Sequence, residues 1–341
     1  MKAAVLERFG DIDAIQIKDI ERPKPAAGEA LLEVRAAALN HLDIWIRRGS
    51  RKDVPLPWVF GSDAAGVVAE LGPGARGLDV GQEVVMHSGL DRIEADAPLS
   101  HGRRMVEGII GVARPGAFAQ YVAVPDYSLH PKPAHLDFAA ASAICVDHLT
   151  AFRMVFSRAH LFVGERVLIH GIGGGVALAA LQLVTAAGGR AIVTSSSDEK
   201  LARAKEMGAA AGINYHTAGD VAEAVLAATD GRGVDVVIDS VGGATWGINF
   251  KAARRGGRIV HCGVTGGAEA TADISTLYWK QLSVLGATLG SQEEFDELLH
   301  LMSDRAMAPV IDSTWPLEQI HQATQRLESG QQFGKIVLTV S

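Results

Sequence analysis

RVLIHGIGGGVALAALQLVTAA, residues 166–187, is the stretch that decides the fold. Its beginning, Arg166–His170, predicts a short apolar strand, Gly171–Gly175 a tight turn, and Val176–Ala187 an Ala- and Leu-rich helix. A strand, a glycine turn and a helix in this order are typical of the unit that holds the phosphates of a dinucleotide. Bare amides and the positive end of the helix must reach the pyrophosphate there, and a Cβ would stand in the way.

The chain around the turn supports this interpretation more strongly than the glycines do. Gly171, Gly174 and Ala177 fit G-x-x-G-x-x-A rather than strict G-x-G-x-x-G, and such a match alone also fits a turn without a ligand. Strand and helix patterns then alternate over residues 191–196, 198–207, 212–215, 221–229, 234–240, 244–254 and 258–263, and a further strand pattern covers 281–288. This alternation predicts a parallel, doubly wound sheet, and therefore one dinucleotide site.

The N-terminal part of the chain has a different pattern. Short strand patterns separated by Gly and Pro occupy residues 1–6, 14–20, 29–39, 65–72, 82–87 and 117–124. They predict a small, partly open antiparallel barrel, interrupted by a polar surface lobe over residues 87–116. After Gly290, two helix patterns and two strand patterns form a tail that we expect to fold back onto this domain.

Composition excludes several classes of protein. The 341 residues, 48% hydrophobic and 21% charged, are enough for two ordinary globular domains. A net charge of −7 without a basic tract argues against nucleic acid as a partner, and no apolar run is long enough to span a membrane. The charged N-terminus lacks the apolar core of a signal peptide, which predicts a cytoplasmic protein. Two cysteines, Cys145 and Cys262, cannot form a disulfide framework or a Cys-rich zinc site.

The end of the second strand of the α/β region favours NADPH over NADH. A site for NAD usually has Asp or Glu there, bound to the ribose 2′-hydroxyl. Here the strand ends in three serines, Ser195 to Ser197, and Lys200 follows one turn later with a positive charge suited to a 2′-phosphate. The nearest acid, Asp198, lies where we expect a helix N-cap.

With these motifs in place, the chain resembles a medium-chain dehydrogenase/reductase over essentially its full length, nearest to the quinone oxidoreductase branch. The stretches that match are 38–49, 61–85, 170–183, 213–217, 233–243 and 333–338. The resemblance implies an α/β protein with a GroES-like catalytic domain (residues 1–147 with 289–341), a Rossmann domain (residues 148–288), a cleft between them, hydride transfer with a nicotinamide, and a homodimer. In relatives the last Rossmann strand, here near residues 282–287, pairs across the two-fold axis.

The same resemblance implies roles for individual residues. It places Gly174, Gly175 and Val176 against the pyrophosphate, and Ser195, Lys200 and Tyr215 around the 2′-phosphate. It places Val241 and Gly242 near the nicotinamide ribose. It has four further residues line the groove from adenine to nicotinamide: Cys262, Gly263, Val264 and Leu289. It places Asn40 and Thr150 near the nicotinamide, and it has Lys335 reach back into the cleft. The aromatic residues Trp45, Trp58 and Tyr278 are candidates for flanking a planar substrate, and packing explains each of them equally well.

The chain departs from the zinc enzymes of the family at the catalytic metal. Where those enzymes have Cys, His and Cys or Asp, this sequence has Asn40, Ser62 and Val146. An amide, a hydroxyl and an isopropyl group cannot hold zinc, which predicts that the chain binds no metal. Other candidate ligands, His41, Asp43, Asp63, Cys145, Asp147 and His148, lie nearby in the sequence. The lobe over 87–116 corresponds to the structural zinc lobe but contains no cysteine.

Without a Lewis acid, the sequence favours reduction of an acceptor that is already polarised. We expect NADPH-dependent reduction of a quinone or of the C=C bond of an α,β-unsaturated carbonyl. In this scheme Asn40 or a backbone N–H donates a hydrogen bond to the carbonyl oxygen, and water or a group such as His148 supplies the proton. Two alternatives stay open: a zinc-type alcohol dehydrogenase, and a non-catalytic NADPH-binding protein with a structural or regulatory role.

Overall fold

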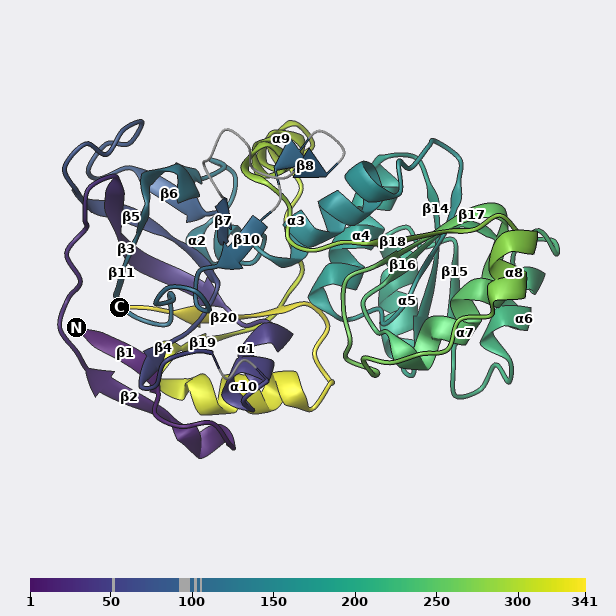
Figure 1. Ribbon diagram of the computed structural model, residues 1–341, viewed down its shortest axis with the longest axis horizontal. Coiled ribbons are helices and arrows are strands. Elements are labelled where there is room, and N and C mark those ends of the chain that lie inside the picture. The colour runs from purple at the N-terminus through teal and green to yellow at the C-terminus, as the bar shows by residue number, and fades with distance from the viewer. Residues whose placement is uncertain (51–52, 92–98, 101–102, 105) are drawn as a thin grey trace. The chain divides into compact units, whose positions relative to one another are not determined.

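The computed structural model describes residues 1–50, 53–91, 99–100, 103–104 and 106–341 (Figure 1). The chain divides into two compact units, Met1–Leu149 with Leu289–Ser341, and Thr150–Thr288. We call them the β-rich unit and the α/β unit. Part of the polar lobe predicted over 87–116 lies outside the described residues. No helix of the described chain is long and apolar enough to cross a membrane.

The β-rich unit is built on a sheet in the order β12-β6-β5-β3-β20-β19, with β11 also paired to β3. Its strands pair antiparallel except for β19 and β20, which pair in parallel. Its described strands are β1 Lys2–Leu6, β2 Ile15–Asp19, β3 Glu29–Ala38, β4 Trp58–Val59, β5 Asp63–Leu71, β6 Glu83–Met86, β7 Gly89–Asp91, β8 Leu99–Ser100, β9 Arg103–Arg104, β10 Val106–Ile109, β11 Tyr121–Pro125, β12 Leu129–Pro131, β19 Ile311–Pro316 and β20 Lys335–Thr339. Its helices are α1 His41–Arg47, α2 Phe138–Ser142, α9 Gln292–Asp304 and α10 Ile320–Glu328, and α3 Asp147–Phe152 contains the boundary between the units. The tail folds back as expected, because β20 pairs with β3.

The α/β unit contains a parallel sheet in the order β15-β14-β13-β16-β17-β18 (Figure 1). Its strands are β13 Arg166–Ile169, β14 Arg190–Ser195, β15 Ala211–Asn214, β16 Val234–Asp239, β17 Ala253–His261 and β18 Ser283–Gly286. The connecting helices are α4 Gly175–Ala186, α5 Asp198–Glu206, α6 Val221–Ala227, α7 Gly243–Ala252 and α8 Ile274–Trp279. The strand order reverses between β13 and β16, as the predicted doubly wound sheet requires.

Local differences from the predicted elements have identifiable causes. Helix α7 ends at Ala252, earlier than expected, because the chain already pairs with β16 at Ala253. Helix α1 was not predicted, although Asn40 and Asp43 form a capping box that marks its start. The N-cap of α5 is Ser197, whose side chain accepts from the Lys200 amide. The predicted N-cap, Asp198, is therefore wrong, and its carboxylate accepts from Asn214 instead.

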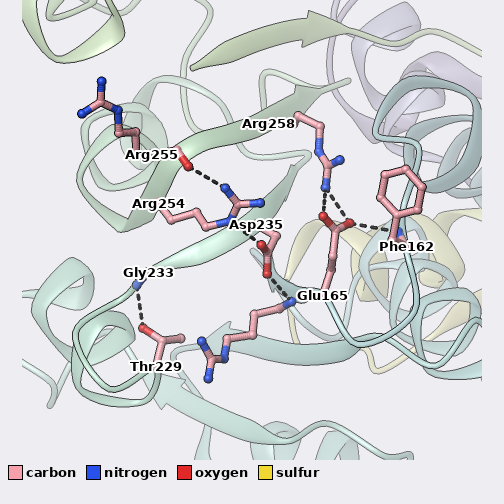
Figure 2. A network of polar contacts seen from close by, with 9 residues as sticks. Phe162, Glu165, Thr229, Gly233, Asp235, Arg254, Arg255 and Arg258 are labelled. Atoms are coloured by element: carbon pink, nitrogen blue, oxygen red, sulfur yellow. Dashed lines mark hydrogen bonds and ion pairs between the residues drawn. The ribbon is translucent and has the colours of Figure 1, made fainter. Parts of the chain in front are cut away.

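Ion pairs connect residues near the starts of three strands of the parallel sheet (Figure 2). Arg258 Nη2 lies 2.5 Å from both carboxylate oxygens of Glu165, and the Glu165 carboxylate also accepts from the Phe162 amide. Asp235 pairs with Arg254 and accepts from the Arg166 amide at 2.7 Å. These contacts join the starts of β13, β16 and β17, and so stabilise the scaffold rather than a ligand site.

Candidate active site

The carboxyl ends of β13 and β16 carry the loops where a doubly wound sheet binds its ligand. The loop after β13 is the glycine turn, in which Gly171 has φ +73° and Gly173 has φ +114°. A Cβ built on Gly171 would lie 3.4 Å from Cγ2 of Val241, in the loop after β16, so the two loops are neighbours. The crevice expected from the topology therefore lies between these two loops.

The predicted phosphate-binding residues lie at the start of α4. Gly174 is the N-cap, and Gly175 and Val176 form the first turn, whose amides have no partner within a helix. A Cβ built on Gly174 would meet only the carbonyl oxygen of Gly171, at 3.5 Å. The protein itself thus leaves the space beside Gly174 open, and this space fits a phosphate that approaches the backbone closely.

The structure brings the three predicted 2′-phosphate residues to one end of β14. Ser195 is the last residue of this strand, and its Oγ accepts from the Ser197 amide at 3.2 Å. The Tyr215 amide donates to the Ser195 carbonyl at 3.0 Å, and Tyr215 is 46% exposed. Lys200 lies in the first turn of α5, directly after the strand end. Their contact with a nucleotide stays a prediction.

The remaining predicted groove residues follow β16 and β17. Asp239 holds the Val241 and Gly242 amides at 2.7 and 3.1 Å. Gly242 has φ +100°, and a Cβ there would lie 2.6 Å from the Gly267 carbonyl oxygen, so the turn requires glycine. Two further residues, Gly263 and Val264, follow β17, and a Cβ on Gly263 would collide with the Ser240 carbonyl. Thr150 and Leu289 are both buried where the chain passes from one unit to the other.

A buried ammonium lies beside Asn40, one of the two predicted catalytic residues. Lys335 Nζ lies 2.7 Å from Asn40 Oδ1 and 3.0 Å from a carboxylate oxygen of both Asp63 and Asp147. The Lys335 side chain is 3% exposed, and its three N–H groups face three oxygen acceptors. We call these four residues the lysine cluster. The contact of Lys335 with the cofactor stays a prediction. The other predicted catalytic residue, His148, is buried in the same unit.

The chain brings the cluster together from distant segments. Asn40 caps α1 directly after β3, Asp63 begins β5, and Lys335 begins β20. Strand β3 lies between β5 and β20 in the sheet, with Ala38 opposite both Asp63 and Val337. Each of these residues was a candidate from the sequence, but their pairing was not predictable, because their proximity depends on this strand order.

Burial and charge set the protonation of the cluster. Burial raises the pKa of Asp63 to about 6, although the Lys335 ammonium lowers it. Burial disfavours the ammonium, but the carboxylates of Asp147 and Asp63 hold the pKa of Lys335 above its usual value. Asp43, in contact with Asn40 through the Asn40 amide at 2.7 Å, is fully buried, and burial raises its pKa to about 8. At neutral pH the site thus contains a charged lysine and a protonated Asp43.

The pKa of Asp43 predicts that stability falls as pH rises. The unfolded chain loses this proton near its ordinary pKa of 3.8 and the folded chain near 8, so the stabilisation is complete below pH ~4 and lost toward pH 8. We expect Asp43 to account for a loss on the order of 3 kcal/mol between pH 5 and 8. The side chain of Asp43→Asn cannot ionise, and its oxygen can still accept from the backbone N–H of Asn40. This variant should therefore show a weaker decrease of unfolding free energy with pH in chemical denaturation. The exposed control, Asp304→Asn, should keep the slope of the unmodified protein, and an equal slope in Asp43→Asn would contradict the assignment.

Comparison with known proteins agrees with both units. Residues 26–134 match the family model for an alcohol dehydrogenase GroES-like domain, and residues 175–304 match that for a zinc-binding dehydrogenase. The crystal structure of an NAD-dependent alcohol dehydrogenase superposes with a TM-score of 0.94 and 36% identity over 100% of both chains. The chain belongs to the medium-chain dehydrogenase/reductase superfamily. The predicted fold, with its GroES-like and parallel-sheet domains, is confirmed.

Similar members of the medium-chain dehydrogenase/reductase superfamily carry the names of different activities. The quinone oxidoreductase of Rattus norvegicus is 28% identical, over 99% of this chain and 97% of its own. A crotonyl-CoA carboxylase/reductase in complex with NADP superposes with a TM-score of 0.90 and 26% identity, over 100% of this chain and 95% of its own. The chain is therefore an oxidoreductase of this superfamily with a fold that binds a nicotinamide cofactor.

The residues present do not fit the zinc that the name of one family model implies. Among the described residues, no group of three or more His, Cys, Asp or Glu side chains is arranged to hold a metal ion. Two carboxylates that directly follow ligand positions of the zinc enzymes in the sequence, Asp63 and Asp147, are paired with the Lys335 ammonium. A zinc ion bound to these carboxylates would compete with a cation that the protein already supplies.

Proposed function

We propose that this protein is an NADPH-dependent, zinc-independent reductase of quinones or of the C=C bond of α,β-unsaturated carbonyls. The lysine cluster is the observation that carries the proposal. The Lys335 ammonium contacts Asn40, which occupies one of the zinc-ligand positions of the family, and two carboxylates that directly follow the other two positions in the sequence. The end of β14 supports NADPH over NADH. This strand ends in Ser195, where an Asp or Glu side chain would repel a 2′-phosphate.

The lysine cluster gives Asn40 a defined orientation. Its Oδ1 accepts from the Lys335 ammonium, which turns Nδ2 away from that charge. Nδ2 is buried and makes no hydrogen bond of ordinary geometry in the described chain, and Asp63, whose pKa the Asn40 side chain lowers, is the carboxylate that competes with a substrate oxygen for this donor. An amide polarised by an ammonium at its oxygen is a strengthened N–H donor. Asn40 is thus suited to hold an oxygen on which negative charge develops.

The reaction follows from this donor. When bound, NADPH supplies a hydride. The acceptor takes the hydride on its electrophilic carbon, and its oxygen gains the negative charge that Asn40 stabilises. A proton from water or from His148 then gives the saturated carbonyl or, from a quinone, an adduct that becomes the hydroquinone when a proton moves from carbon to oxygen. Lys335 is a positioning residue here, because it acts through Asn40.

A turnover screen tests the proposed function. The purified protein is assayed with NADPH, and again with NADH, against quinones, enones and aldehydes, and its zinc content is measured. We expect turnover of quinones or enones with NADPH, without dependence on zinc. One tightly bound zinc per chain, lost on chelation together with activity on alcohols, would contradict the proposal. Tight NADPH binding without any turnover would favour a non-catalytic role.

We also propose that the protein is a homodimer, joined through the edge strand β18. This strand is the last in the order of the parallel sheet and has three exposed residues out of four. Helix α8 presents Ile274, Tyr278 and Trp279 to solvent, at 70%, 65% and 72% exposure. An unpaired strand edge beside exposed apolar side chains is suited to pairing with a second copy of the same strand.

Substitution at this edge tests the dimer. Val284, 39% exposed in β18, becomes a buried charge in the dimer when replaced by lysine. We expect Val284→Lys to behave as a monomer in light scattering after gel filtration. Val163→Lys, at a position 84% exposed outside β18 and α8, should leave the mass unchanged. A monomeric unmodified protein, or a dimeric Val284→Lys, would refute this interface.

A further inference from the structure

A chain of hydrogen bonds with one fixed direction runs beneath the glycine turn. The Gly171 amide can only donate, and it donates to Thr194 Oγ1 at 3.3 Å. Thr194 Oγ1 lies 3.1 Å from His170 Nδ1, and the roles in this contact are set from the other end of the chain, where the Asp239 carboxylate can only accept. Asn249 Nδ2 therefore donates to Asp239 Oδ2 at 2.5 Å, and Asn249 Oδ1 accepts from His170 Nε2 at 2.8 Å. In a neutral imidazole with its proton on Nε2, Nδ1 then accepts from the Thr194 hydroxyl. We call this chain the histidine relay.

The histidine relay ends on the group that shapes the second loop. Asp239 is the last residue of β16, and its Oδ1 accepts from the Val241 and Gly242 amides. Its Oδ2 accepts from Thr245 at 2.8 Å as well as from Asn249, so all four lone pairs of the carboxylate are used. The relay thus connects the loop after β13 with the loop after β16 through side chains alone.

We propose that His170 is a positioning residue that couples the two loops of the dinucleotide site. This inference rests on the proposed function, since it concerns the site assigned to NADPH. The residues of the relay between the loops are 0–2% exposed, so His170 itself touches no ligand. Its effect on a dinucleotide acts through the backbone of Gly171 at one end and of Val241 and Gly242 at the other.

A neutral imidazole with its proton on Nε2 makes both bonds of the relay. Position 170 must accept at one ring nitrogen and donate at the other, and burial lowers the pKa of His170, which favours the neutral form. A phenylalanine ring preserves the shape but removes both bonds. A glutamine retains a donor toward Asn249, so it recovers part of the connection.

Titration of NADPH into matched variants tests the relay. We expect His170→Phe to weaken NADPH binding about tenfold, Thr194→Val about fivefold, and His170→Gln less than His170→Phe. The double variant His170→Phe/Thr194→Val should bind as weakly as His170→Phe alone, because both changes break the same relay. At saturating NADPH, kcat should stay within about twofold, since the acceptor site is untouched.

A control separates positioning from general destabilisation. Glu165→Gln weakens the opposite end of the same sheet, and it should lower the melting temperature without changing the Kd for NADPH. If folded His170→Phe and Thr194→Val bind NADPH as tightly as the unmodified protein, the relay inference is wrong and the proposed function stands. If the unmodified protein binds no dinucleotide, both are wrong. If it binds NADPH but turns over no acceptor, the proposed activity is wrong, while the Kd values still decide the relay.

Discussion

Replacing Lys335 by methionine should lower kcat, measured at saturating NADPH, about 10³-fold. Methionine keeps the length of the side chain but removes the charge that turns Asn40 Oδ1 inward. Without the Lys335 ammonium, the side-chain amide of Asn40 has no fixed orientation. Its N–H is therefore lost as a donor to the negative charge that develops on the substrate oxygen. The free energy of unfolding should also fall, by about 3–5 kcal/mol, because Asp63 and Asp147 lose their buried counter-ion.

A second substitution separates catalysis from stability. Lys335→Met/Asp63→Asn removes one positive and one negative charge, so it should recover much of the stability that Lys335→Met loses. It should not recover turnover, because the ammonium that orients Asn40 is still missing. A double variant that regains both would show that Lys335 only stabilises the fold.

The β-rich unit offers a matched control for the loss of a buried lysine. The Lys132 side chain is 6% exposed, pairs with Glu83 at 3.1 Å and donates to the Leu136 carbonyl at 2.6 Å. Lys132→Met should therefore lower stability while leaving kcat of the folded protein unchanged. Stability is measured by denaturation, and kcat by NADPH oxidation with the acceptor that the screen identifies.

The parts of the fold that local chemistry determines were predictable from the sequence. The glycine turn lies where it was expected, because only residues without a Cβ adopt the backbone of Gly171 and Gly173 easily. The alternation after it predicted the parallel sheet, since each strand and helix is specified within a short window. Helix α8 was not predicted, because none of its residues is buried and its Leu277 is only partly buried against the core of the α/β unit.

The lysine cluster and the histidine relay could not be predicted in the same way. Lys335 and Asn40 are 295 positions apart, and the ion pairs depend on β20 lying beside β3. His170 looked like the polar end of an apolar strand, and its partner Asn249 lies 79 positions further along. Long-range polar contacts follow from strand order and burial, which no local pattern contains. One signal was present: Asp239, at the end of an apolar strand, is a buried carboxylate that requires partners.

Replacing Ser195 by aspartate should lower kcat/KM for NADPH about 10²-fold and leave that for NADH within about threefold. Ser195 is the last residue of β14, where an acid would bind a ribose 2′-hydroxyl and repel a 2′-phosphate. An aspartate there can still accept from the Ser197 amide, as the Ser195 hydroxyl does, so the strand end should keep its conformation.

Lysine substitutions in α5 provide the complementary test. If Lys200 supplies the charge for the 2′-phosphate, Lys200→Met should weaken NADPH binding about tenfold and leave NADH binding unchanged. Lys205→Met removes the same charge from the last turn of α5, away from the end of β14, and should affect neither cofactor. The unmodified protein provides the decisive comparison, because a 2′-phosphate site at Ser195 and Lys200 requires that it prefer NADPH. Equal kcat/KM for NADH and NADPH would contradict the assignment of NADPH as the cofactor. It would not contradict the proposed role of the lysine cluster, because that role is tested by kcat at saturating cofactor.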